Sequence, residues 1–379
     1  HLIKNLYIDY IGTGDKIYER TNYGLFGNVH NGTVNRTFVV SGRYEPYVSD
    51  LNGTAGKNIG GLVGFMDGTS TVSNSEAAVT IMDFNNDATV TGNVMGGLVA
   101  KMNNGEIHSS MAMDTLSVGS NYHGVLGGLV GSASAGAINN SFANGAFSIS
   151  SSSAKAGGLV GDNVASVRNC YVTWNDSYVM ASDKFGSLAA SNTAASNIQN
   201  CYVKENSTYG TTVSEGSSVD ESCKQYSPVN SADMLGYMYA DNKIEGDTAM
   251  FVAMNRWVTN ANNSIPHKYA TWARPGLQEI NGDLPVLLLS EFDGTKDHQG
   301  GFRSLSTYEG GPALQYGGPA RDTIASSSPQ LDGALTRATA GNSIFIYGDV
   351  VCAPTVPVSA DKVSIYEDAS ILHPGSLVT

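Results

Sequence analysis

Apolar and polar residues alternate along the first part of the chain, to about residue 215, in a pattern that repeats. Runs of three to six residues rich in Val, Ile, Phe and Tyr are separated by Asn, Gly, Ser and Asp. Runs this short between turn-forming residues are typical of β-strands, and a glycine inside a helix costs about 1 kcal/mol relative to alanine. The pattern therefore predicts many short strands joined by turns.

One unit recurs six times in this region. Its first half is a Gly-Leu-apolar-Gly run, as in Gly157–Gly161, and its second half follows eight to ten residues after the Leu, as in Val167–Val172. Successive Leu residues lie 37, 36, 31, 30 and 29 positions apart. One copy has too little apolar surface to form a core, so a period of about 30 residues predicts a stack of coils, an all-β parallel β-solenoid.

Parallel stacking would place equivalent side chains in ladders, because each coil advances by one strand spacing, roughly 4.8 Å. Six coils would then make a rod of roughly 29 Å. The predicted structural ladder is Leu25, Leu62, Leu98, Leu129, Leu159 and Leu188. A Val/Ile ladder comprises Val34, Val72, Ile107, Ile138, Val167 and Ile198, and a small-residue ladder comprises Thr37, Ser75, Ser110, Ser141, Cys170 and Cys201.

The copies resemble the GLUG-motif repeat family, through Gly61-Leu62-Val63-Gly64, Gly128-Leu129-Val130-Gly131 and Gly158-Leu159-Val160-Gly161. The resemblance covers about residues 23–215. It implies a β-solenoid in a large surface or secreted bacterial protein, either adhesin-like or related to IgA1-specific metalloproteases. No catalytic residue is carried over by it.

Four parts are predicted along the chain: a repeat solenoid over 1–215, a helix-plus-hairpin capping segment over 216–292, a Gly/Ser/Pro-rich connection over 293–330, and the truncated start of a second β-helix over 331–379. Residues 1–22 are expected to form a partial first coil, in which Leu2–Ile8 takes the place of the second half of the unit. Longer excursions at Arg43–Ile59 and Asp83–Val94 are expected to project as loops and to form the variable contact surface. The chain begins inside a strand-like run, as a piece of a longer protein would.

Helical signals begin after residue 215. Ser231 is the expected N-cap of a short helix over Ala232–Met238, and Thr248 is the expected N-cap of a longer one over Ala249–Val258. The apolar face of the second helix would comprise Met250, Phe251, Met254, Trp257 and Val258. Strands are expected at Tyr269–Trp272 and Leu284–Leu288, which resembles the closing segment that follows GLUG repeats.

The last part of the chain has the form of a short helix, a turn and a strand over Leu331–Val350. That form resembles the N-terminal cap and first coil of a pectate-lyase-like right-handed β-helix. Strands at Val363–Tyr366 and Ala369–Leu372 would continue it for about two coils.

The composition and net charge limit the kinds of partner that the chain is expected to bind. Of 379 residues, 41% are hydrophobic and 15% charged, and the net charge of −13 argues against nucleic acid and anionic membrane surfaces. Neither a membrane-spanning apolar stretch nor a signal peptide is recognisable. Nineteen Tyr, with many Asn, Ser and Thr, suit adhesion or glycan binding and equally suit any exposed solenoid.

Four cysteines do not make a disulfide framework. Cys170 and Cys201 occupy the same position in successive copies, so their Cα atoms would lie about 4.8 Å apart, within the disulfide range. In-register side chains point side by side, which favours two buried thiols. A disulfide stays open as the alternative.

The sequence lacks the common motifs of catalytic and nucleotide-binding sites. No His-Glu-x-x-His occurs among the seven histidines, and no nucleophile elbow, Walker loop or dinucleotide fingerprint occurs either. Asp83–Asp87 is similar to the start of an EF-hand calcium loop. Ala88 and Val94 stand where such a loop has Gly and Glu, which favours a surface turn. Carboxylates paired across coils for glycoside cleavage remain possible. The sequence therefore predicts no catalytic, cofactor-binding or metal residue and no cofactor.

Two functions remain. In the first, the chain is a non-catalytic adhesive or spacer segment of an exported bacterial protein, monomeric, extracellular or associated with the outer membrane, which binds host extracellular proteins or glycans. In the second, it is the non-catalytic repeat region of a secreted IgA1-protease-like metallopeptidase whose catalytic module lies outside this chain.

Overall fold

The computed structural model describes the chain in segments, namely residues 2–9, 21–45, 56–83, 91–174, 179–180, 184–205, 211–232, 238–245, 248–265, 268–273, 284–287, 322–325, 343–346 and 364–367. The chain divides into two compact units, residues 1–225 and 226–379. Each unit is described by itself.

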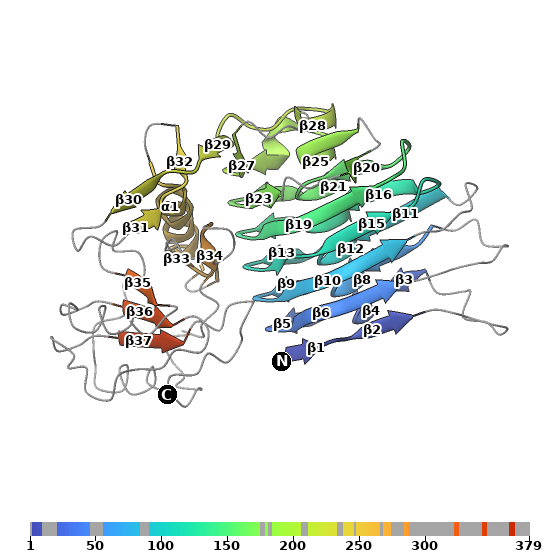
Figure 1. Cartoon of the computed structure of the whole chain (residues 1–379), viewed down its shortest axis with the longest axis horizontal. Helices are drawn as coiled ribbons and strands as arrows, with labels where there is room; N and C mark the ends of the chain where they lie inside the picture. Colours follow the sequence, from blue (N-terminus) through green and yellow to red (C-terminus); the bar gives the residue numbers. More distant parts are fainter. Residues whose placement is uncertain are drawn as a thin grey trace. The chain divides into compact units, whose positions relative to one another are not determined.

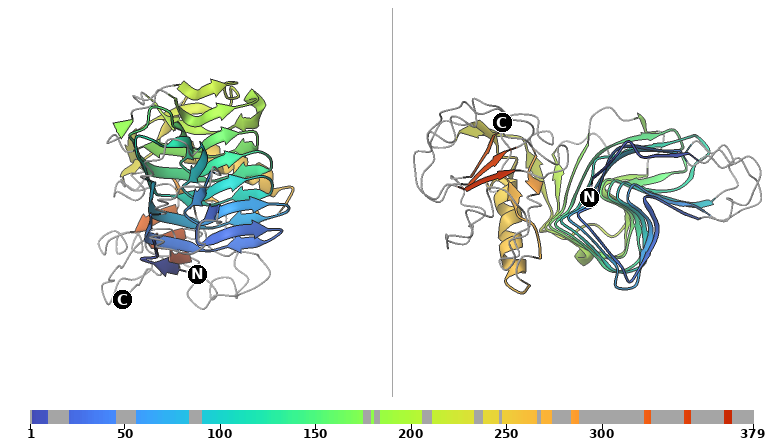
Figure 2. Two further views of the ribbon diagram at one scale, coloured as in Figure 1. Left: turned by 90° about the vertical axis from the view of Figure 1, so that its right-hand side faces the viewer. Right: turned by 90° about the horizontal axis from the view of Figure 1, so that it is seen from below.

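Unit 1 is a parallel β-solenoid, as predicted. Its strands stack in chain order from blue to green in Figure 1, and successive coils follow nearly the same path when viewed along the stack in Figure 2. They form three sheets, here called A, B and C. Among the described residues of this unit, every strand pair is parallel; examples are β6 with β10 in sheet A, β8 with β12 in sheet B and β9 with β13 in sheet C.

Sheet A comprises β1 (Leu2–Lys4), β2 (Tyr7–Asp9), β6 (Phe38–Glu45), β10 (Glu76–Asp83), β14 (Met111–Ala112), β15 (Thr115–Val118), β19 (Phe142–Ile149), β23 (Tyr171–Trp174), β24 (Val179–Met180), β27 (Tyr202–Lys204) and β29 (Lys224–Ser227). Sheet C comprises β5 (Thr33–Asn35), β9 (Thr71–Ser73), β13 (Glu106–His108), β18 (Ala137–Asn139), β22 (Ser166–Arg168) and β26 (Ile198–Gln199), which the short 3-10 turn η2 (Ala195–Asn197) precedes.

Sheet B has two halves. The first comprises β3 (Asn22–Tyr23), β7 (Asn58–Gly60), β11 (Thr91–Gly96), β16 (His123–Gly127) and β20 (Lys155–Gly157). The second comprises β4 (Phe26–His30), β8 (Val63–Asp67), β12 (Val99–Met102), β17 (Val130–Ala133) and β21 (Val160–Asn163). The continuous strand β25 (Phe185–Asn192) joins the halves, and β28 (Thr211–Gly216) pairs with it.

Glycine pairs make the bend between the halves of sheet B. A Cβ on Gly127 would lie 1.8 Å from the carbonyl oxygen of Val130, and one on Gly128 would lie 2.0 Å from that of Gly158 in the next coil. The first glycine therefore permits the tight bend, and the second permits the close approach of the neighbouring coil. In the sixth copy Ser187 follows Gly186, and there β25 runs through without a break.

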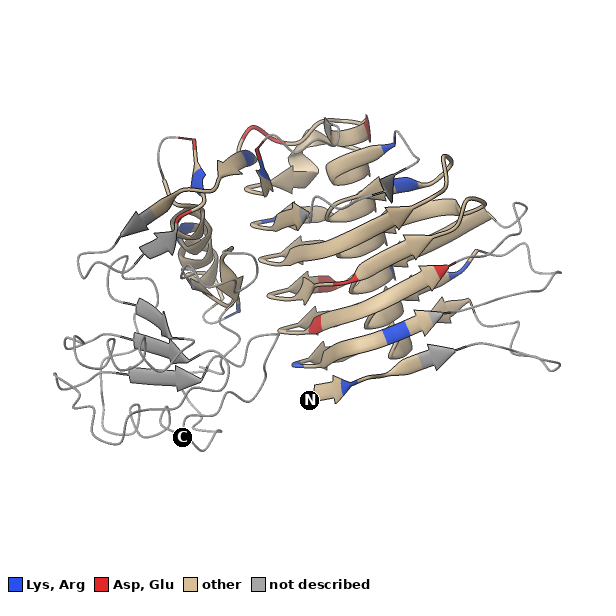
Figure 3. Ribbon diagram, viewed as in Figure 1, with Lys and Arg blue, Asp and Glu red and all other residues tan. Residues whose placement is uncertain are grey.

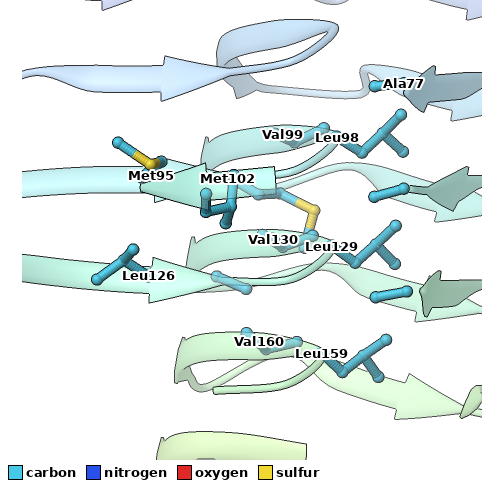
Figure 4. Close-up of a cluster of buried hydrophobic side chains, with 14 of the residues drawn as sticks. Ala77, Met95, Leu98, Val99, Met102, Leu126, Leu129, Val130, Leu159 and Val160 are labelled. Carbon is cyan, nitrogen blue, oxygen red and sulfur yellow. The ribbon is translucent and has the colours of Figure 1, made fainter. Parts of the chain in front are cut away.

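The core lies between the sheets and is built from the predicted ladders. Figure 4 shows Leu98, Leu129 and Leu159 one above another in consecutive coils, with the adjacent valines beside them. The Val/Ile ladder is buried throughout, with each member at most 6% exposed. Such stacking gives each coil the apolar neighbours that it cannot supply by itself.

A second regular feature is the corner between sheets C and A. The residue before each member of the small-residue ladder has a positive φ, as at Asn74 (49°), Asn140 (51°) and Asn169 (53°). Asn tolerates this left-handed conformation better than most residues. Ladder hydroxyls then tie the coils together, because the Ser75 N–H donates to Ser110 Oγ and the Ser110 N–H to Ser141 Oγ, both at 3.1 Å.

Both ends of the solenoid extend the six copies. The predicted partial first coil is present, since β1 and β2 pair with β6. At the other end β28 and β29 form a partial seventh coil, so the compact unit reaches residue 225 rather than about 215. The excursions begin later than expected, because β6 runs to Glu45 and β10 to Asp83. Their middles lie outside the described residues.

Unit 2 contains the predicted longer helix, α1 (Met250–Asn262), with Met250, Phe251, Met254 and Val258 buried. Its N-cap is Ala249 rather than Thr248. The expected hairpin is present as β33 (Trp272–Ala273) paired antiparallel with β34 (Val286–Leu287). It is tied to α1, because the Trp272 N–H donates to Asn255 Oδ1 at 2.8 Å.

The prediction of a short helix over 232–238 is wrong at both ends of that range. Ala232 belongs to β30 (Asn230–Ala232) and pairs antiparallel with Met238 of β31 (Met238–Ala240). Pairing with a neighbouring strand outweighs a weak helical preference. A further antiparallel pair joins β29 to β32 (Lys243–Ile244).

Three strands near the C-terminus pair in parallel, namely β35 (Asp322–Ala325), β36 (Ser343–Ile346) and β37 (Ser364–Glu367). The last two lie where strands of a second β-helix are predicted. The first lies inside the segment predicted as a connection, which therefore contains a strand. The helix expected after Leu331 and the strand at Ala369–Leu372 fall outside the described residues.

Candidate binding face

The second half of sheet B carries a row of outward-facing side chains, one from each coil. Register aligns Asn28, Phe65, Lys101, Ser132, Asp162, Ser191 and Glu215. We call this set the outer row. Its members are exposed or half-buried, whereas the next ladder along the strands, which includes Met66 and Met102, belongs to the core. Neighbours in the row are one strand spacing, about 4.8 Å, apart.

A second row lies on the first half of sheet B. It comprises Asn22, Asn58, Val94, Val125 and Lys155. The bend brings the two rows into contact at both ends of the stack. Asn22 Nδ2 donates to Asn28 Oδ1 at 2.6 Å near the N-terminal end. The Lys155 ammonium pairs with the Glu215 carboxylate near the other end.

The chemistry of the two rows is mainly hydrogen bonding. Ser191 donates from Oγ to Asp162 Oδ1 at 2.6 Å, and Asn58 donates from Nδ2 to Asn22 Oδ1 at 2.6 Å. The hydrogen bond between Lys155 and Glu215 raises the pKa of the ammonium and lowers the pKa of the carboxyl. Figure 3 shows few charged residues on the described strands, with both signs among them. The face therefore presents amides, hydroxyls and charges of both signs, with a few apolar side chains among them, rather than a field of one sign.

Two carboxyl groups are buried where the sequence gave no signal for them. Glu76 is 0% exposed and Asp114 is 3% exposed. Asp114 Oδ1 accepts the Val79 N–H at 2.6 Å. Burial raises the pKa of both carboxyl groups well above the ordinary range, and the charge of Asp114 adds to the effect on Glu76. Glu76 stands in register with Phe38 and Met111, so its position is otherwise apolar.

A cluster of three buried polar residues lies where the excursions join the stacked coils. Lys57, Asp83 and Asn93 are each less than 10% exposed. The Lys57 N–H donates to Asn93 Oδ1 at 2.9 Å. Burial lowers the pKa of the Lys57 ammonium, and the charge of Asp83 opposes that shift. Asp83, predicted in a surface turn, is instead the buried last residue of β10.

The predicted Leu ladder lies in the core beneath this face. Leu62, Leu98, Leu129, Leu159 and Leu188 are at most 1% exposed, and each N–H of the first four donates to the next leucine carbonyl at 2.9 Å. Leu25 is half-buried at the N-terminal end. These residues position the face and do not contribute side chains to it.

Sequence reasoning missed one rung of the small-residue ladder. The Lys224 N–H donates to the Cys201 carbonyl at 3.0 Å, as the Tyr202 N–H does to the Cys170 carbonyl at 2.9 Å, so Cys223 is the next rung after Cys201. Cys201 and Cys223 lie only 22 positions apart, which is shorter than any spacing between the repeat leucines. The apolar residue before the turn, Val219, packs against the core and could have signalled the coil.

The described residues show no feature typical of a metal site or a membrane-spanning helix. They contain no group of three or more His, Cys, Asp or Glu side chains that could hold a metal ion. No helix within those segments is long and apolar enough to cross a membrane.

The whole chain was compared with protein-family models, with curated proteins and with solved structures. None of them matches. The likeness to GLUG-motif repeats therefore rests on the sequence copies alone, and the binding face rests on the register of the coils.

Proposed function

We propose that this chain is a non-catalytic, adhesive β-solenoid segment of an exported bacterial surface protein, which also acts as a rigid spacer. Its partners would be host extracellular proteins or glycans that lie along the outer row. The observation that carries the proposal is the alignment of seven outward side chains, from Asn28 to Glu215, by continuous strand register.

Rigidity supports this proposal. The rows are held by backbone hydrogen bonds from coil to coil and by a core of stacked Leu and Val residues, so the backbone that carries them needs little ordering when a partner binds. An extended partner with repeated hydroxyl or amide groups could contact several rungs at once. Multiple weak hydrogen bonds, each worth about 0.5–1.5 kcal/mol, would then add to a useful affinity.

The experiment is a screen of the whole chain against immobilised glycans and host extracellular proteins. Three alanine replacements in the outer row, at Lys101, Ser132 and Asp162, should weaken binding by roughly tenfold or more. The matched control replaces Thr80, Thr115 and Ser148, which are half-buried, outward-facing residues of sheet A. The control should change affinity less than about twofold.

Other outcomes would contradict the proposal. Absence of saturable binding to either set of ligands would contradict the adhesive role, and equal losses in the two triple variants would contradict the outer row as the binding face. Chelator-sensitive cleavage of IgA1 by the purified chain would overturn the non-catalytic assignment. Binding that survives both triple variants but is lost on shortening 46–55 or 84–90 would place the contact on the excursions.

A further inference from the structure

We propose that Cys201 and Cys223 are a disulfide-forming site that fastens the partial seventh coil to the stack. The three described cysteines of this ladder, Cys170, Cys201 and Cys223, are free thiols in the structure. They occupy consecutive rungs of one ladder, so each thiol has a thiol neighbour.

The geometry places Cys223 beside Cys201. The Lys224 N–H donates to the Cys201 carbonyl at 3.0 Å, so the segments that lead into β27 and β29 are neighbours at this point. Cys223 Sγ donates to the Ile198 carbonyl at 3.4 Å, as Cys170 Sγ does to the Ile138 carbonyl at 3.8 Å. Neighbouring strands of a sheet are about 4.8 Å apart, and disulfides join Cα atoms roughly 4.4–6.8 Å apart.

Accessibility selects this pair over Cys170 and Cys201. Both of those thiols are buried, whereas Cys223 is half-buried at the end of the ladder. Cys223 also belongs to a turn, in which its N–H donates to the Asp220 carbonyl at 3.0 Å, and only Lys224 begins the strand β29. A turn can move its Cβ toward Cys201 more easily than a residue held between two coils.

The reaction needs an oxidant, for which a small disulfide such as oxidised glutathione suffices. Cys223 loses its proton and attacks one sulfur of the small disulfide, and the departing thiolate takes up a proton. Cys201 then loses its proton and attacks Cys223 Sγ, which releases the second small thiol. Two protein S–H bonds and one small S–S bond break, one protein S–S bond and two small S–H bonds form, and the electrons pass to glutathione.

Two consequences follow. Hydrogen bonding to Cys201, followed by burial, raises the pKa of the Cys223 thiol, so oxidation should be slow at neutral pH and faster at alkaline pH. The bond would close a loop through β28, which in the described residues pairs only with β25. Closing that loop restricts the unfolded chain, so the end of the solenoid should resist unfolding better after oxidation.

The test uses the whole chain, equilibrated at pH 8 in glutathione buffers of increasing oxidised fraction. Unfolded samples are alkylated, and cross-linked peptides are identified by mass spectrometry. We expect a peptide joining Cys201 to Cys223, two fewer alkyl groups on the oxidised chain than on the reduced chain, and a thermal midpoint roughly 5 °C higher. The midpoint shift should reverse on reduction.

Two variants separate this site from its neighbours. Cys223→Ser should fold, because serine occupies the same rung at Ser75, Ser110 and Ser141, and it should lose both the cross-link and the midpoint shift. Cys170→Ser should keep both. Recovery of a Cys170–Cys201 bond, a bond to Cys352, or all four thiols alkylatable in the most oxidising buffer would each overturn the proposal.

Discussion

At the scale of single residues, the interior of the solenoid tolerates a few polar groups at a cost. Asp114 points into the core, where its Oδ2 lies 2.5 Å from the position of a Cβ on Gly97. The neighbouring coils carry Val79 and Gly145 at this position, so only a glycine on the facing bend leaves room for the carboxyl group. A buried carboxyl without full hydrogen bonding disfavours its charged form.

This burial predicts a pH dependence of stability. Because the folded-state pKa of Asp114 is raised above its ordinary value of 3.8, the folded state binds more protons than the unfolded state above that pH. The contribution of this group to stability is therefore highest at low pH and falls as the pH rises toward the folded-state pKa.

Asp114→Asn should remove that contribution. The amide oxygen can still accept the Val79 N–H, so the variant should be about 1–2 kcal/mol more stable than the parent at pH 8 and should gain less at pH 5. Urea unfolding at the two pH values measures the difference. A variant that loses equal stability at both would contradict burial of an ionisable carboxyl group.

The leucine ladder gives a second prediction at this scale. Leu129 is 0% exposed in the middle of the stack, so Leu129→Ala should cost about 2–5 kcal/mol of unfolding free energy. The matched control, Leu25→Ala, removes the same atoms at a half-buried site in the first full coil and should cost less than half as much. Equal losses in denaturant unfolding would contradict the assignment of the ladder to the core.

At the scale of elements, the sequence predicts the coils well because each rung carries a chemical signature. The Gly-Gly-Leu bends and the alternating Val/Ile rungs recur, and stacking requires that they coincide. Cys223 was missed because its coil is shortened. The strand at Asn230–Ala232 was missed because its partner is set by tertiary pairing rather than by local preference.

The candidate face was less predictable than the coils. The leucine ladder was visible from sequence, but the outer row has no common residue type, since it runs from Asn28 through Phe65 and Lys101 to Glu215. Only the register identifies its members. The buried Glu76 and Asp114 are likewise invisible, because carboxyl groups in a polar-rich repeat look like surface residues.

Substitutions of the glycines at the bend of sheet B test how closely neighbouring coils approach. A Cβ on Gly128 would lie 2.0 Å from the Gly158 carbonyl oxygen, which is backbone and cannot move aside alone. Gly128→Ala should therefore destabilise the protein by about 1–3 kcal/mol or more. Gly32→Ala is the control, since its Cβ would meet a Val29 methyl at 3.2 Å and the His30 carbonyl oxygen at 3.8 Å, and it should cost under about 1 kcal/mol. Similar thermal midpoints for the two variants would contradict the close approach of coils.

At the scale of the whole molecule, the repeat sets the distance between equivalent residues of different coils. Every coil adds one strand spacing, so equivalent positions along the outer row should be evenly spaced from Asn28 to Ser191. Both the proposed binding face and the proposed disulfide depend on that spacing, because each requires side chains of different coils to lie in register.

Distances between spin labels along the outer row test this spacing most directly. Labels on ketone-bearing residues introduced at 28 and 162 span four coils, and labels at 28 and 191 span five. Pulsed electron paramagnetic resonance should give means of about 19 Å and 24 Å, with the second longer by one strand spacing. Equal mean distances for the two label pairs would contradict parallel in-register stacking. A difference between the two means of a strand length, about 15 Å or more, would contradict it as well.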